Sequence, residues 1–321
     1  MQRQHLLLVS AVILGLARIT AMPSSCFYTT GKYTEPDYCE EPSQPHLGCD
    51  NAKRWGKKCG EPRSIIKMTF GLRRRIVRQH NVYRNMVAKG NMAGLPVAGR
   101  MLTMGWDRVL AGLAELAVMR CEIDPIRMSF STTYASRPGY NAAFSKYPKN
   151  QEQDKRKILD SHLRAWYDQY RYANMKSLRT GKSSGGREIS HFLQLMNGEN
   201  SRVGCAMASF HTGSWKNQLL ICLYGCGKRR GEYVYSIGKV PGESCTCGTE
   251  KDFRNLCYLE SDKVDCSMKR KKEVVEETDD EYDYDYGIFG PSKTTTTTTT
   301  KKPKKQCRPG SMGSILDWIF G

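Results

Sequence analysis

Long apolar runs are nearly absent from this chain of 321 residues. The main one, residues 6–17, is shorter than the roughly 20 residues that a membrane-spanning helix needs. It follows Arg3 and His5 and precedes Ala21, which is the order of basic, apolar and small residues in a secretory signal peptide. We therefore expect residues 1–21 to be a signal peptide, and we expect no stable membrane insertion.

The chain also lacks an N-glycosylation sequon, and acidic residues are scarce relative to basic ones. It carries 50 Lys and Arg against 32 Asp and Glu, a formal net charge of +18. Residues 22–266 hold most of this excess, with 38 basic and 23 acidic residues. A protein with this excess of positive charge attracts anionic surfaces in general. The short basic runs 73–75 and 228–230 have no interleaved aromatic residues, so no nucleic-acid partner is expected.

Cysteine, in contrast, is abundant, with thirteen residues that all lie beyond the predicted signal peptide. In an exported chain this number favours disulfides over reduced thiols. Residues 22–63 combine four of these cysteines with many prolines and glycines, which predicts a disulfide-stapled, loop-rich N-terminal arm. An odd total leaves one thiol over, and Cys307 is the candidate. A monomer is expected unless this thiol links two chains.

The composition changes completely after Cys266. Residues 273–286 contain eight carboxylates, and residues 294–300 are seven consecutive threonines flanked by lysines. Charge blocks with few apolar residues do not bury enough surface to offset the entropy of ordering. We therefore expect residues 267–321 to be a disordered acidic, threonine-rich and basic tail, whose threonine run is typical of O-glycosylated stalks.

Helical and strand-like patterns fall in two groups along the chain, helices first and strands later. Apolar spacing predicts helices over residues 69–89, 106–120 and 152–175. Residues 122–150 have no clear period and are expected to be mainly loop. Short β-rich runs predict strands over residues 203–210, 219–224 and 233–237. This grouping indicates an α+β fold rather than a parallel α/β sheet.

The first predicted helix carries a histidine on its apolar side. Ile76, His80, Tyr83 and Val87 recur at the spacing of one helical stripe. A histidine in such a stripe is more often hydrogen-bonded within a core than catalytic. We expect His80 to be a packing residue.

Three segments in the second half carry the strongest motifs. Residues 190–195 read S-H-F-L-Q-L, residues 203–206 read V-G-C-A, and residues 222–225 read C-L-Y-G. A short amphipathic stretch thus leads into two β-rich runs with one cysteine each. That spacing suits two neighbouring strands tied by a bridge between Cys205 and Cys222.

These segments resemble the signatures of the CAP superfamily (cysteine-rich secretory proteins, antigen 5 and pathogenesis-related 1), and most of all its insect venom-allergen, or antigen 5-like, branch. Further matches are H-N-x-x-R from His80, Trp106-Asp107, G-x-N from Gly139, and Trp166. Together they cover about residues 39–257. The resemblance implies an α-β-α sandwich over residues 64–240, followed by a small cysteine-rich hinge over residues 241–266.

The resemblance also implies disulfide pairs, which can be transferred position by position. The implied pairs are Cys39–Cys49, Cys59–Cys121 and Cys205–Cys222. The pairing of the other seven cysteines stays open; they are Cys26, Cys226, Cys245, Cys247, Cys257, Cys266 and Cys307.

Some members of the family bind a divalent metal with two histidines and two acidic residues around a cleft. The corresponding positions here are near Pro125 and at Tyr140, Gln169 and His191, so only one histidine remains. Proline and tyrosine are not practical zinc ligands, and a glutamine has no charge to offset metal desolvation. We therefore expect no metal site, no cofactor and no catalytic residues. Tyr140, Gln169 and His191 would be the remnants of the cleft.

An intact scaffold with a degraded cleft indicates a secreted, non-enzymatic protein that acts by binding. The expected partner is an extracellular protein, a glycosaminoglycan or a lipid. One alternative is an extracellular lipid or sterol carrier, since some family members bind such ligands. Another is a hydrolase with an atypical site around His191, although Ser190 beside it has no identifiable orienting acid. A third is an adhesive protein that works through its tail.

Overall fold

The computed structural model describes residues 39, 45–49, 51–92, 94–123, 129–132, 138–183, 185–229 and 231–258. The predicted signal peptide, most of the predicted N-terminal arm before residue 45, and the predicted disordered tail lie outside these residues. The same holds for Cys26, Pro125, Cys266 and Cys307. Within the described ranges, no helix is long and apolar enough to cross a membrane.

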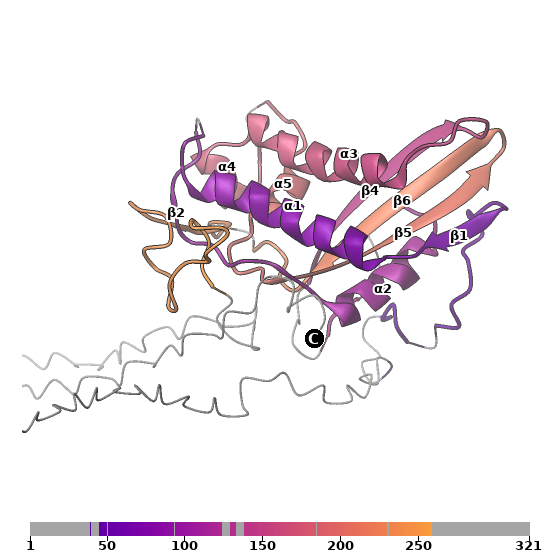
Figure 1. Ribbon diagram of the computed structural model, residues 1–321, viewed down its shortest axis with the longest axis horizontal. Helices are drawn as coiled ribbons and strands as arrows, with labels where there is room; N and C mark the ends of the chain where they lie inside the picture. Colours follow the sequence, from indigo (N-terminus) through magenta and orange to yellow (C-terminus); the bar gives the residue numbers. More distant parts are fainter. Residues whose placement is uncertain are drawn as a thin grey trace, which may run out of the picture.

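A central antiparallel sheet organises the structure (Figure 1). Its strands lie in the order β1 (Arg63–Ile66), β5 (Arg202–Thr212), β6 (Trp215–Tyr224) and β4 (Gly139–Pro148). A short strand, β3 (Gly105–Trp106), runs parallel to β5. A separate ribbon pairs β2 (Ala98–Arg100) with β7 (Ser236–Ile237).

Helices cover both faces of this sheet, which gives the three layers that the resemblance implies (Figure 1). One side carries α1 (Phe70–Ala88), α3 (Lys155–Asp168) and α5 (Ser190–Met196), whereas the other carries α2 (Arg108–Val118). A 3₁₀ turn (Gln169–Tyr172) and α4 (Met175–Thr180) follow α3. The predicted α+β class and α-β-α sandwich are therefore confirmed.

The two faces of the sheet have separate apolar cores because successive strand side chains point in opposite directions. Leu220, Cys222 and Tyr224 of β6 belong to the core under α1, α3 and α5. The residues that alternate with them belong to the core under α2; they are Leu219, Ile221 and Leu223. Since both faces are covered, β6 is apolar along most of its length rather than alternating.

The expectation of a loop over residues 122–150 is wrong for its second half. Residues 139–148 form β4, a ten-residue strand that pairs along its whole length with β6. Its sequence has no clean alternation because one end is buried under helices and the other is exposed, with Phe144 and Lys146 open to solvent. Pairing with β6 therefore stabilises this strand although its local sequence pattern does not predict one.

Two other elements are shorter than expected. The helix predicted over residues 152–175 begins after Asp154, whose side chain accepts a hydrogen bond from the Arg156 amide, and its α-helical part ends at Asp168. The strand predicted over residues 233–237 is reduced to Ser236–Ile237.

The other two predicted helices are confirmed to within two residues at each end. Each begins at a side-chain cap, Thr69 for α1 and Asp107 for α2. These side chains accept hydrogen bonds from amides that a helix start leaves unpaired.

Disulfides tie the sheet and the segments around it. The structure contains the three implied pairs, Cys39–Cys49, Cys59–Cys121 and Cys205–Cys222, together with Cys245–Cys257 in the predicted hinge. Cys226 is disulfide-bonded as well. Cys205 and Cys222 lie directly opposite each other on β5 and β6, with their Cα atoms 4.0 Å apart.

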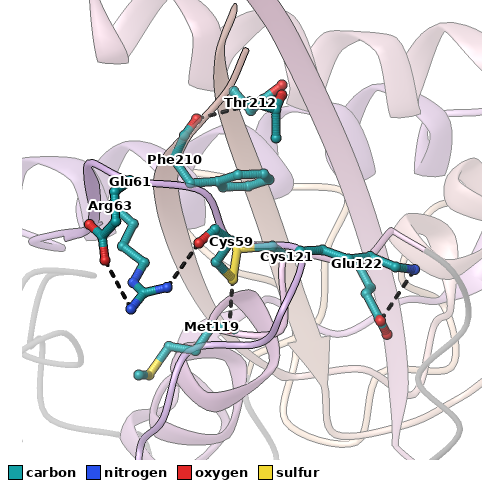
Figure 2. Close-up of a disulfide and its surroundings, with 10 residues drawn as sticks. Cys59, Glu61, Arg63, Met119, Cys121, Glu122, Phe210 and Thr212 are labelled. Atoms are coloured by element: carbon teal, nitrogen blue, oxygen red, sulfur yellow. Dashed lines mark hydrogen bonds and ion pairs between the residues drawn. A yellow bond between two sulfur atoms is a disulfide. The ribbon is translucent and has the colours of Figure 1, made fainter.

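The Cys59–Cys121 bridge fastens the segment before β1 to the end of α2 (Figure 2). Both cysteines and the neighbouring Phe210 of β5 are buried in the α2 core. Arg63 holds the same segment, since its guanidinium donates to the Cys59 carbonyl at 2.9 Å and pairs with Glu61 at 2.9 Å. The disulfide therefore holds the segment before β1 to the end of α2, and the contacts of Arg63 hold residues 59–63 together.

Candidate functional site

Four polar side chains meet between the sheet and the helices α1 and α5. They form the polar network, defined as His80 of α1, Asn141 of β4, His191 of α5 and Tyr224 of β6. His80, Asn141 and Tyr224 are fully buried, and His191 is half-buried beside the ring of Trp166. Buried polar groups of this kind are costly unless they are hydrogen-bonded to one another.

The hydrogen bonds in the polar network form one continuous chain. His80 Nδ1 lies 2.8 Å from the Ile76 carbonyl, which accepts only, so this nitrogen carries the proton. His80 Nε2 is then the acceptor for the Tyr224 hydroxyl at 2.9 Å. The Asn141 amide nitrogen donates to the Tyr224 hydroxyl at 3.3 Å and to the His191 carbonyl at 3.1 Å. The Asn141 oxygen remains as acceptor for His191 Nδ1 at 3.1 Å.

Burial keeps the titratable side chains of the polar network neutral. It lowers the pKa of His80 to about 4, with a smaller contribution from the Arg84 cation. Burial also lowers the pKa of His191, against the opposing effect of Glu188, and raises the pKa of Tyr224. The donor and acceptor roles described above are those of neutral imidazoles and a neutral phenol, so geometry and protonation agree at neutral pH.

Gln169 lies next to the polar network and holds the beginning of α5. Its side-chain oxygen accepts a hydrogen bond from the Phe192 amide at 3.0 Å. Glu188 accepts another from the Ser190 amide at 2.6 Å. The residue that precedes α5, Ile189, has no capping side chain, so these two residues satisfy amides that a helix start leaves unpaired. Gln169 therefore has a structural role here.

The structure brings together only two of the three predicted cleft positions. Gln169 and His191 lie on adjoining segments, joined through Phe192. Tyr140 faces the other core: its ring packs edge-to-face on Phe130, at 6.1 Å between centroids, beneath α2. Because side chains alternate along β4, the neighbour Asn141 occupies the face that His191 shares. The fourth position, near Pro125, lies outside the described residues.

The donor set around His191 does not fit a metal of the family type. The Gln169 oxygen is already an acceptor for a backbone amide, and the Asn141 oxygen is an acceptor for His191 itself. No group of three or more His, Cys, Asp or Glu side chains in the described ranges is arranged to hold a metal ion. A single neutral imidazole does not complete a zinc site.

A serine and a histidine do meet in this structure, but away from His191. Ser145 of β4 and His162 of α3 lie 2.7 Å apart, between hydroxyl oxygen and Nε2. His162 Nδ1 is buried without a hydrogen-bond partner among the described residues. Burial lowers the pKa of His162 to about 4, which makes it a weak base. This pair lacks the acid that orients and supports the histidine of a catalytic triad.

The H-N-x-x-R motif is structural throughout. Asn81 makes two hydrogen bonds to the backbone of Met104, at 2.9 and 2.8 Å. Arg84 is fully buried and donates to the carbonyls of four residues, among them Leu102 and Leu195, at 2.7 to 3.1 Å. The motif fastens α1 to the segment before β3 and to residues 195–200, which run from the end of α5 toward β5. The prediction that His80 is a hydrogen-bonded core residue is confirmed.

Asn141 and Tyr224 are the two members of the polar network that sequence reasoning did not single out as site residues. Both stand in motifs that the sequence does show, G-x-N and C-L-Y-G. A tyrosine at the end of the apolar run 219–224 was the available signal, because a buried hydroxyl usually needs a partner. The identity of its partners depends on the pairing of β4 with β6 and on how α1 packs on the sheet, which the sequence does not specify.

The chain is similar to proteins of known type. Residues 77–224 match the model of the cysteine-rich secretory protein family, CAP. Venom allergen-1 of Aedes albopictus is 29% identical over 247 residues, which span 75% of this chain and 92% of that protein. Venom allergen-1 of Aedes aegypti is 25% identical over 253 residues, 78% and 95% of the two chains. Antigen 5 like allergen Cul n 1 of Culicoides nubeculosus is 28% identical over 198 residues, 59% and 87%.

Proposed function

Because the chain belongs to the CAP family, in its antigen 5-like branch, we propose that it acts outside the cell by binding another molecule and not by catalysis. Its similarity to venom allergens supports an extracellular location. So do the disulfides, which persist in oxidising compartments.

The observation that carries this proposal is the closed polar network. His191 donates to Asn141, Asn141 donates to Tyr224, and Tyr224 donates to His80. A general base or a metal ligand must have a lone pair directed at a substrate or an ion. His80, Asn141 and Tyr224 direct their polar atoms at one another or at backbone carbonyls, so the lone pair of His191 Nε2 is the one that these hydrogen bonds leave over. His191 Nδ1 donates to an amide oxygen and not to a carboxylate, and in the described ranges no group of metal-ligating side chains surrounds this imidazole.

The first test is zinc binding, measured as the melting temperature of the purified full chain with and without zinc chloride. A ligand that binds only the native state raises the melting temperature by mass action. We expect a change of no more than about 1 °C, and the same change in His191→Ala. A larger rise that disappears in His191→Ala would mean that the remnant cleft still holds a metal.

A second test addresses hydrolysis. The full chain is treated with a fluorophosphonate probe, which labels activated serines, beside Ser145→Ala and Ser190→Ala. We expect no labelling that depends on either serine, because His162 Nδ1 has no partner among the described residues and His191 Nδ1 donates to the Asn141 amide oxygen rather than to a carboxylate. Labelling lost in one variant alone would identify a nucleophile and contradict the proposal. Extraction of sterol from vesicles by the wild type would instead favour a carrier.

A further inference from the structure

The central sheet extends beyond the helices at one end. In Figure 1, β4, β5 and β6 run past α2 toward the hairpin that joins β5 to β6. A two-residue turn, Gly213-Ser214, closes this hairpin, and Gly213 has the positive φ of 55° that such turns require. The side chains that gather here form the sheet-end surface, defined as Lys146, Lys149, His211, Trp215 and Lys216.

Basic side chains lie on both faces of this sheet end. Lys216 pairs with His211 on β5 and with Tyr147 on β4, so these residues share the face toward α3. Lys146 alternates with Tyr147 and therefore points to the face toward α2. Lys149 follows the end of β4, where its amide donates to the Ser214 carbonyl at 3.2 Å. The positive charge thus surrounds the end of the sheet.

These cations have no acidic partners in the part of the chain that the structure describes. Lys146, Lys149 and Lys216 form no ion pair with any residue in the described ranges, although several arginines elsewhere do. His211 lies among them, and its pKa is lowered by desolvation and by the charges of Lys149 and Lys216. Like charges held close together without neutralisation are the footprint of a surface for an anionic partner.

An aromatic side chain lies within this charge cluster. Trp215 is 40% exposed, and the Lys146 ammonium sits 4.8 Å from the centroid of its ring. Phe144, two residues before Lys146 on the same face, is 37% exposed. Tryptophan offers a large rigid contact surface at a small entropic cost, so an exposed one is a typical binding residue. Here its apolar face adjoins a positive charge.

We propose that the sheet-end surface binds a sulfated linear polysaccharide. A pyranose ring would stack on Trp215, and sulfate or carboxylate groups along the chain would contact Lys146, Lys149 and Lys216. A flexible chain can follow charges around both faces of the sheet, whereas a flat anionic bilayer meets only one.

The proposal rests on the proposed binding function and names its ligand class. The experiment measures binding of the full chain to immobilised heparin, for the wild type and for the triple variant Lys146→Ala, Lys149→Ala, Lys216→Ala. A matched control removes three exposed lysines elsewhere: Lys176→Ala, Lys239→Ala and Lys251→Ala. Both variants have the same net charge. We expect the first to weaken binding on the order of tenfold and the control about twofold.

The stacking contact is tested by Trp215→Ala, which leaves the charge unchanged, beside Trp215→Tyr, which keeps an aromatic ring. We expect Trp215→Ala to weaken heparin binding about fivefold and Trp215→Tyr to restore most of it. Melting temperatures show whether each variant is folded.

Three outcomes would overturn the proposal: no binding to heparin, equal losses in the two triple variants, or no effect of Trp215→Ala in a folded protein. If the triple variant Lys146→Ala, Lys149→Ala, Lys216→Ala lost binding to phosphatidylserine vesicles but kept its binding to heparin, the surface would instead be assigned to membranes. None of these outcomes changes the zinc and fluorophosphonate results, so failure here and failure of the proposed function are distinguishable.

Discussion

Two regions of this molecule differ in whether their polar side chains interact with one another. In the polar network, His80, Asn141, His191 and Tyr224 are directed at one another, and burial keeps the histidines neutral. In the sheet-end surface, three lysines around Trp215 have no acidic partner in the described ranges. Both regions draw on β4 and β6. The difference separates groups that stabilise the scaffold from groups that are available to a partner.

The largest loss of stability is expected from removing the Cys205–Cys222 disulfide, because the strand that it holds contributes residues to both regions. Cys205–Cys222 joins β5 to β6, and β6 carries Tyr224 at one end and Trp215 at the other. Replacing both cysteines by alanine should lower the free energy of unfolding by about 2–5 kcal/mol. Guanidinium unfolding followed by tryptophan fluorescence measures this change.

The matched control removes the hinge pair, Cys245→Ala with Cys257→Ala, which lies outside the sheet. We expect this variant to lose less stability than the Cys205 and Cys222 variant. A greater loss from the hinge pair would mean that the sheet does not depend on its own disulfide.

The polar network alone is tested by Tyr224→Phe, which removes a single oxygen. His80 Nε2 and one Asn141 N–H then lose their partner inside the core. We expect the free energy of unfolding to fall by about 1–3 kcal/mol. Tyr233→Phe, at a tyrosine that is 42% exposed, should change it by less than about 0.5 kcal/mol. Equal effects would show that the Tyr224 hydroxyl does not hold the network.

A smaller effect is expected from pH. His80 and His162 have a folded pKa of about 4, below the ordinary value of 6.5, so the unfolded chain binds their protons first as pH falls. Their contribution to stability is therefore complete above about pH 6.5 and decreases toward pH 4. Between about pH 7 and pH 5.5, each histidine should account for a loss of about 1 kcal/mol.

The variant His162→Gln separates one of these histidines from the other. Urea unfolding at about pH 7 and about pH 5.5 gives the loss for each protein. We expect the loss in His162→Gln to be smaller than in the wild type by about 1 kcal/mol. An identical loss in both would mean that His162 is protonated as readily in the folded state as in the unfolded one.

The sequence predicts the polar network better than it predicts the sheet-end surface. The motifs H-N-x-x-R and S-H-F-L-Q-L identify His80 and His191, and the apolar helical stripe predicts that His80 is buried. Tyr140 was assigned to the cleft, yet the alternation of β4 directs Asn141 there instead. β4 itself has no local pattern that distinguishes it from a loop. Its position depends on pairing with β6, a contact between residues distant in sequence.

The sheet-end surface could not be predicted for a similar reason. Lys146 and Lys149 are far from Lys216 in the sequence, and no motif joins them. Trp215 reads equally well as a core residue until the helices are seen to end short of it. Exposure and the absence of acidic partners within the described ranges are properties of the assembled sheet, so only the structure reveals them.

The most direct test of the contrast uses two tryptophans as reporters. Trp166 contacts His191 in the polar network, and Trp215 belongs to the sheet-end surface. Indole resonances of the ¹⁵N-tryptophan-labelled full chain are followed during titration with a heparin hexasaccharide and assigned with Trp→Phe variants. We predict that the Trp215 signal shifts in a saturable manner while the Trp166 signal stays unchanged. A saturable shift of Trp166 without one of Trp215 would contradict the account, because the ligand would then bind at the remnant cleft.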